Sequence, residues 1–151
     1  MEAATEAWIR EFEEGWRRPA GPDAFTDHFE PILDPEVRLV QPQVPTAVGR
    51  RAFRELFARP VFTLIPDLHA EVHEWAVRGD VAYVEFTLRG TLGGRPIAWR
   101  AVDRLTLREG LLVERRSFFD PGPLLVAVLT RPRAWPRFVR AQLVRLRARR
   151  S

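Results

Sequence analysis

The clearest pattern in the chain is an alternation of apolar and polar residues between positions 81 and 120. Two short turns divide this stretch. Gly93-Gly94 is a strong signal for a two-residue hairpin turn, and Glu109-Gly110 is a second turn signal. The stretch therefore predicts three antiparallel strands. A turn at Gly93-Gly94 places these apolar side chains on one face of the sheet: Val84, Phe86, Leu88, Trp99, Ala101, Leu105 and Leu107.

Asp103 interrupts this apolar face. A carboxylate there is costly unless it is paired or lines a cavity. A two-residue turn at Glu109-Gly110 would bring Arg116 opposite Asp103, whereas a bulge at Gly110 would bring Arg115 there. An Asp–Arg pair is therefore expected in either register, and it can serve either catalysis or strand alignment.

The flanking segments predict five helices and two more strands. Helices are expected at 3–17, 22–31, 49–59, 124–130 and 136–149, and strands at 36–41 and 68–77. Helices come first and strands follow, which indicates an α+β fold. We expect a curved, mostly antiparallel sheet of about five strands, with the N-terminal helices packed on its concave face and a cavity where Asp103 points. We assign residues 1–130 to this domain and residues 131–151 to a basic helical tail.

Composition and charge narrow the function classes. The chain has 151 residues, of which 46% are hydrophobic, and no cysteine. Without cysteine or a long apolar run, a cytoplasmic protein is expected. The net charge of +4 comes from the tail, where eight arginines occur without an acid; the other 16 arginines face 20 acids. The body is therefore acidic, and no nucleic-acid partner is expected.

The tail is basic and amphipathic, with Val139, Leu143 and Leu146 on one face. Such a helix can touch an anionic membrane surface. We favour the alternative, in which the helix packs on its own acidic body or on the second subunit of a dimer.

The stretch WRAVDRLTLREGLLVERRSFFDP, at 99–121, resembles the C-terminal half of the nuclear-transport-factor-like superfamily. This superfamily includes SnoaL-type polyketide cyclases, ketosteroid isomerases and limonene epoxide hydrolases. The order of predicted elements over about 1–130 fits the same group. The resemblance implies a cystatin-like cone, formed by helices laid over a curved sheet, with a small-molecule pocket inside. It says little about the reaction, because one fold hosts many chemistries.

The resemblance assigns roles to three positions. Asp103 falls where ketosteroid isomerases keep a protonated aspartate, and Asp120 falls where the cyclases keep their acid–base aspartate. The general base of the isomerases corresponds to Gln41. The first helix lacks the isomerase tyrosine, since Tyr83 is the only tyrosine in the chain. Steroid isomerisation is therefore not expected.

We interpret the chain as a cofactor-free acid–base enzyme of the cyclase, isomerase or epoxide hydrolase type. Asp103 and Asp120 would carry protons, Arg116 (or Arg115) would tune them, and Gln41 would orient the substrate. A small apolar organic substrate would contact an apolar set: Phe12, Trp16, Val84, Phe86, Leu88, Trp99, Leu105 and Phe118. The alternative is a non-catalytic binding module of the same fold, which a closed pocket or an outward Asp120 would favour. Asp120 can also simply cap the helix that follows it.

Other ligands and the oligomeric state complete the expectations. His69 and His73 lie four residues apart on a predicted strand, where they do not form a metal site without further ligands. No metal or cofactor is expected, and no phosphate-binding loop or nucleophile elbow occurs. A homodimer is expected through the outer face of the sheet, which carries Tyr83, Thr87, Arg100 and Arg104.

Overall fold

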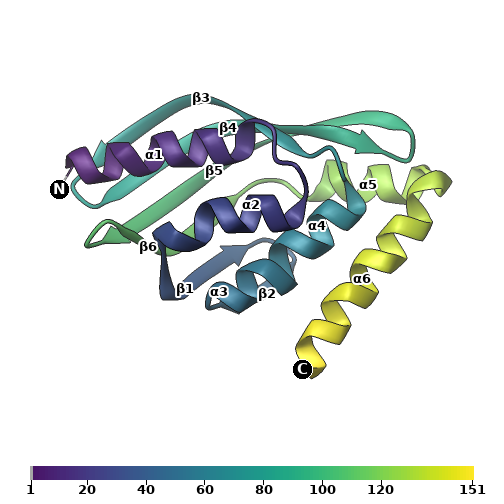
Figure 1. Cartoon of the computed structure of the whole chain (residues 1–151). Helices are drawn as coiled ribbons and strands as arrows, with labels where there is room; N and C mark the ends of the chain where they lie inside the picture. The colour runs from purple at the N-terminus through teal and green to yellow at the C-terminus, as the bar shows by residue number, and fades with distance from the viewer. Residues whose placement is uncertain (1) are drawn as a thin grey trace.

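The three strands expected between 81 and 120 form the centre of a six-stranded sheet in a computed structural model that describes residues 2–151 (Figure 1). The strands are β1 (Leu33–Gln41), β2 (Val44–Val48), β3 (His69–Arg78), β4 (Val81–Leu92), β5 (Arg95–Arg108) and β6 (Leu111–Phe118). The helices are α1 (Glu2–Arg17), α2 (Pro22–Phe29), α3 (Arg50–Ala52), η2 (Phe53–Ala58), α4 (Arg59–Leu64), α5 (Gly122–Thr130) and α6 (Trp135–Arg150), with short turns η1 (Glu30–Ile32) and η3 (Pro132–Ala134).

The sheet has the order β2-β1-β6-β5-β4-β3, and β1–β6 is its parallel pair. The predicted α+β class and mostly antiparallel sheet are confirmed, but the strand count is six and not five. The additional strand is β2, which contains Pro45. A proline disfavours strand structure, but β2 lies at the sheet edge, where a missing backbone N–H is tolerated.

The β4–β5 hairpin has the predicted register. Gly93 and Gly94 both have positive φ angles, of 62° and 76°, as a two-residue hairpin turn requires. Val84 pairs with Asp103, Phe86 with Ala101 and Leu88 with Trp99. Asp103 therefore lies on the concave face of the sheet, among apolar neighbours.

The β5–β6 pair departs from both expected registers. Leu107 pairs with Leu112, but Thr106 pairs with Glu114, so Val113 is an extra residue on β6. Such a bulge moves every following side chain to the opposite face. Asp103 consequently lies opposite Ser117, and Arg104 lies opposite Arg116. The expected placement of Arg116 across from Asp103 is therefore wrong; the bulge turns Arg115 inward instead.

The core fills the space between the concave face and the helices. The predicted stripe of α1 is buried: Trp8, Ile9, Phe12 and Trp16. Figure 1 shows α1, α2 and α4 on one side of the sheet. Aromatic side chains from α2 and η2 pack on this stripe; for example, the Trp16 and Phe25 ring centroids are 4.6 Å apart. The helices thus cover the sheet as expected of a cone-shaped fold.

The C-terminal helix packs by a different face than its sequence pattern suggested. Figure 1 shows α6 running beside α4, and Ala141 of α6 is 4% exposed. Val139, Leu143 and Leu146 instead face outward, with 54%, 47% and 49% exposed. The small side chain of Ala141 permits close approach to α4, which explains why this face and not the bulkier one turns inward.

The proposed domain boundary at residue 130 stays a prediction. None of the helices within residues 2–151 is both long and apolar enough to cross a bilayer.

Candidate functional site

A cavity of about 270 Å³ lies between the concave face of the sheet and the helices; we call it the large cavity. Leu88, Trp99 and Ser117 line it from the sheet, and Trp16 lines it from α1. Helices α4, α5 and α6 supply much of the remaining wall. Its size and mixture of apolar walls with a few polar groups are typical of small-molecule sites.

The polar groups of the large cavity are hydrogen-bond donors and amides. They are Gln41, Gln43, Trp99, Arg115, Ser117, Gln142 and Arg145. No aspartate, glutamate, histidine or tyrosine of the described chain lines it. No carboxylate of these walls can therefore take a proton directly from a ligand. The donors and amides are suited to binding an oxygen-containing ligand.

Asp103 is fully buried beneath the large cavity and does not line it. Arg115 Nε donates a hydrogen bond of 2.5 Å to Asp103 Oδ2. The other carboxylate oxygen, Oδ1, has no hydrogen-bond partner among the described residues. The side chains of Arg115 and Asp103 are only 9% and 0% exposed, so this is a buried ion pair. Such a pair needs good geometry to offset the cost of removing both charges from water.

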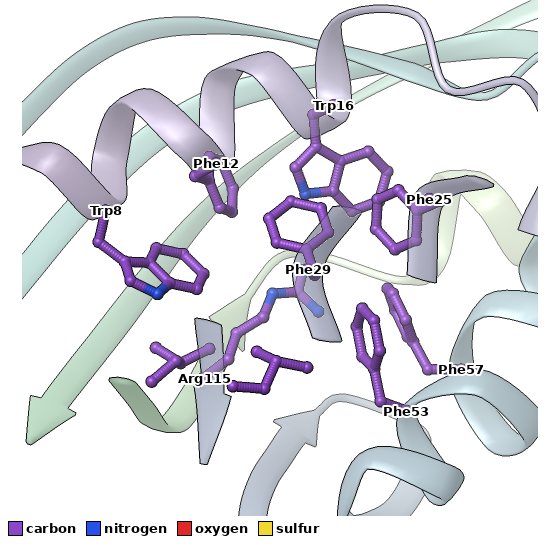
Figure 2. A pocket seen from close by; sticks show the side chains of 10 residues that line it. Trp8, Phe12, Trp16, Phe25, Phe29, Phe53, Phe57 and Arg115 are labelled. Atoms are coloured by element: carbon purple, nitrogen blue, oxygen red, sulfur yellow. The ribbon is translucent and has the colours of Figure 1, made fainter. Parts of the chain in front are cut away.

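Arg115 extends from β6 into a group of aromatic rings (Figure 2). Its guanidinium carbon lies 5.0 Å from the centroid of Phe57, a cation–π distance. Arg115 also lines a second, smaller cavity of about 20 Å³, together with Trp8, Phe12 and Phe29. A volume of this size holds about one water molecule. Arg115 lines both cavities, as do Trp16 and Phe57, so these three side chains lie at the boundary between the aromatic core and the large cavity.

Two further polar atoms, in residues that line the large cavity from the sheet, lack a partner. Ser117 Oγ and Trp99 Nε1 are buried and have no hydrogen-bond partner in residues 2–151. Both residues line the large cavity. A buried polar group without a partner costs about 1–3 kcal/mol. A ligand that accepts a hydrogen bond from either group would offset this cost.

Asp120 does not reach the large cavity, so its predicted placement in the site is wrong. It is exposed, and the Gly122 N–H donates to its Oδ1 at 2.9 Å. Asp120 thus orders the turn that leads into α5; the N-cap residue of α5 is Pro121, so Asp120 is not the helix cap that we considered as the alternative. β6 ends at Phe118, so Asp120 already lies in the connection to α5, just before Pro121, where the chain has left the sheet.

Phe118 is also misplaced in the predicted substrate contacts. It is 53% exposed on the convex face, opposite Val102. The bulge at Val113 changed the alternation of β6, so Ser117 and not Phe118 faces inward. Phe119 lines the large cavity in its place.

The remaining predicted residues divide into three groups. Gln41, Trp16, Leu88 and Trp99 line the large cavity as expected, and Phe12 lines the small one. Val84, Phe86 and Leu105 are fully buried in the core and line neither cavity. Arg116 lies on the convex face, where its Nε atom is 3.5 Å from Glu114 Oε1 and 41% of its side chain is exposed.

The two histidines of β3 make separate hydrogen bonds. His69 binds the Asp67 carbonyl, and His73 binds the Thr87 hydroxyl.

Sequence reasoning missed the contribution of α6. Phe138, Ala141, Gln142 and Arg145 line the large cavity from this helix. They lie at spacings of three, four and seven residues, which is one helix face. This signal was present in the sequence but was weaker than the larger apolar stripe formed by Val139 and its neighbours.

Comparison with known proteins identifies the family and the fold. The model of the SnoaL-like domain family matches residues 6–115. A SnoaL-like polyketide cyclase from Jannaschia sp. CCS1 superimposes with a TM-score of 0.73 and 25% identity, over 87% of this chain and 95% of that one. TerC, co-crystallized with polyporic acid, gives 0.72 and 21% over 84% and 99%. An LEH-like epoxide hydrolase from M. tuberculosis gives 0.67 and 13% over 86% and 92%. No curated protein sequence gives a significant match.

The buried ion pair leads to a stability prediction. Arg115→Gln would leave the Asp103 carboxylate buried without its partner, and we expect it to lower the free energy of unfolding by about 3–5 kcal/mol at neutral pH. Arg116→Gln is the matched control. The Arg116 side chain is 41% exposed, so its ion pair with Glu114 contributes little, and the substitution should change stability by about 0.5 kcal/mol or less. Urea unfolding measures both variants. Equal effects of the two substitutions would contradict the assignment.

Proposed function

Because the chain belongs to the SnoaL-like domain family, we propose that its large cavity binds a small, mostly apolar organic molecule. The observation that carries this proposal is the large cavity itself, about 270 Å³ in volume and bordered by two unpartnered polar groups. The polyporic acid in TerC is an organic molecule held by a protein of this fold. A ligand of similar kind suits the apolar walls here.

The polar end of the ligand would meet the sheet. Trp99 Nε1 can only donate, and Ser117 Oγ can donate or accept. They come from adjacent strands and share the concave face, so a carbonyl or hydroxyl oxygen of the ligand could accept from either. Gln41, at the end of β1, would add an amide at the neighbouring wall. These contacts would orient the ligand, while the apolar lining would supply most of the affinity.

Binding without chemistry is the function that the geometry supports best. Asp120 faces away from the large cavity, and Asp103 is covered by Arg115. No carboxylate of the described residues is in position to touch the ligand. The outward position of Asp120 is the feature that we expected of a binding module.

A cofactor-free acid–base enzyme is the second candidate, and one observation favours it. Asp103 Oδ1 and Ser117 Oγ both lack partners, and their residues are directly paired across β5 and β6. Paired side chains on one face of a sheet have Cβ atoms about 4.5–5.5 Å apart. The Ser117 hydroxyl could therefore pass its proton to Asp103 while it takes one from the ligand. This route would allow cyclisation or isomerisation without a carboxylate in the large cavity.

The binding proposal predicts a specific response to filling the large cavity. We expect the neutral dye N-phenyl-1-naphthylamine to bind with enhanced fluorescence. Leu124→Trp fills the wall at α5 and should weaken binding at least about tenfold, equivalent to about 1.4 kcal/mol. Val126→Trp is the control, since Val126 lies on the same helix but is 58% exposed and outside the large cavity. Absence of dye binding, or equal losses in the two variants, would refute the proposal.

The enzyme candidate makes its own prediction. With any substrate identified from the material that copurifies, Ser117→Ala should lower kcat by about 100-fold or more, as expected for loss of general acid–base transfer. The melting temperature should stay close to that of the native protein, because Ser117 Oγ has no partner to lose. Full turnover in Ser117→Ala would rule out the relay and leave binding as the function.

We also propose a homodimer formed through the convex face of the sheet. Tyr83, Val102 and Phe118 are 46%, 37% and 53% exposed there, on three consecutive strands. Contiguous exposed apolar side chains commonly mark interfaces. A dimer built on this face would leave the large cavity, on the opposite side of the sheet, accessible.

The dimer is tested by placing a charge in the proposed interface. Val102→Asp should convert a dimer into a monomer in sedimentation experiments at micromolar concentration, because each symmetric contact would then bury two carboxylates. Leu129→Asp is the control; Leu129 is 72% exposed on α5, away from this face. A native protein that sediments as a monomer would contradict the proposal, as would dissociation by Leu129→Asp alone.

A further inference from the structure

The C-terminal helix places an arginine without a counter-ion in the wall of the large cavity. Arg145 Nε is buried and has no hydrogen-bond partner among residues 2–151. Its Nη1 lies 3.4 Å from Gln142 Oε1, which is long for a hydrogen bond. Within the described chain, no carboxylate lies within ion-pair distance of Arg145. Gln142 and Arg145 line the same side of the large cavity.

Among the half-buried arginines of residues 2–151, Arg50 and Arg131 donate to backbone carbonyls, and Arg104 Nε is buried without a partner. None of these three lines the large cavity, whereas Arg145 does.

Two other shielded arginines are paired with carboxylates. Arg115 pairs with Asp103, and Arg54 pairs with Asp23, Asp27 and Glu30. Those carboxylates raise the pKa of Arg54, whereas burial and the nearby Arg149 lower the pKa of Arg145. The surroundings of Arg145 therefore disfavour its positive charge. Arginine nevertheless stays protonated in proteins, so the cost is not removed by loss of the proton.

We infer that the large cavity selects organic acids: apolar molecules that carry one anionic oxygen group, a carboxylate or an ionised enol or phenol, which pairs with Arg145. This inference rests on the proposed function and adds the charge of the ligand. A planar guanidinium can hold such a group by two parallel hydrogen bonds, and the Gln142 amide can donate a third. The anion would supply the counter-ion that the protein does not.

The geometry gives the ligand two ends. The anionic group lies at the α6 side, against Arg145 and Gln142. The apolar body fills the space between α4 and the sheet, and a neutral oxygen at the far end meets Trp99 or Ser117. Arg115 does not serve as the anion site, because Asp103 already neutralises it. The family match ends at residue 115, so the charge preference comes from an element outside the matched part of the fold.

A packing role for Arg145 is the competing explanation. Its aliphatic stem can cover apolar surface while the guanidinium contacts solvent. This role would not distinguish a charged ligand from a neutral one of the same shape. The test must therefore compare two ligands that differ in charge alone.

The pair 2-naphthoate and 2-naphthamide meets this requirement, since a carboxylate and a carboxamide have nearly the same shape. Each compound is titrated against the full chain loaded with N-phenyl-1-naphthylamine, and its displacement of the dye is measured. We expect 2-naphthoate to displace the dye at about tenfold lower concentration, because hydrogen bonds to charged groups are stronger than neutral ones. Arg145→Gln should reduce this ratio to about one. Arg140→Gln, an exposed position on the same helix, should keep it.

The outcomes separate the two proposals. Equal displacement by the two compounds in the native protein would overturn the charge inference while leaving the binding proposal intact, and this comparison needs no variant. A native preference that Arg140→Gln abolishes and Arg145→Gln keeps would also overturn it. If the dye binds and neither compound displaces it, the inference fails alone. If the dye does not bind, the proposed function and the inference fail together.

Discussion

The arrangement of the interior depends on the ion pair between Asp103 and Arg115. Both charges are removed from water, so each holds the other in place. The pair joins β5 to β6, and the contact of Arg115 with Phe57 extends it to the helical layer. Replacing either partner would leave an unpaired charge in an apolar setting. The pair therefore fixes the alignment of the strands and the boundary between the aromatic core and the large cavity.

This constraint shapes what the large cavity can do. Asp103 is paired with Arg115 and does not line the large cavity, so the polar groups in the cavity wall are hydrogen-bond donors and amides, with no carboxylic acid among the described residues. Ser117, which is paired with Asp103 across the strands, and Trp99 both line the large cavity, and their side-chain Oγ and Nε1 atoms have no hydrogen-bond partner among residues 2–151. Arg145 adds a positive charge from the opposite side. A mostly apolar ligand with an oxygen group at each end complements these features. Asp103 could take part in proton transfer only indirectly, through the Ser117 hydroxyl.

Much of the fold could be predicted from local sequence rules, whereas the site depended on one irregularity. Gly93-Gly94 determines the β4–β5 register, and this register correctly placed Asp103 on the concave face. The bulge at Val113 has no comparable turn signal, so the identity of the arginine at Asp103 and the direction of Phe118 could not be read in advance. The turn that Asp120 makes with the Gly122 N–H before α5 could not be distinguished in advance from a place in the site, because an aspartate between a strand and a proline suits either role. The cytoplasmic location stays a prediction.

The contribution of α6 was missed for a different reason. The sequence shows two faces on this helix, and hydrophobicity alone favours the one with Val139, Leu143 and Leu146. Packing against α4 instead selects the face with the small Ala141, which brings Phe138 and Arg145 to the large cavity. Which of two helix faces turns inward is decided by the shape of its partner, and that information lies in another part of the chain.

A crystal structure of the protein soaked with N-phenyl-1-naphthylamine tests the central claim most directly. The account predicts electron density for the dye between Leu88, Trp99 and the α5–α6 wall, with the Asp103–Arg115 pair intact beneath it. Density only on the exposed apolar surface of α6, or an ordered structure with no dye in the large cavity at saturating concentration, would contradict it.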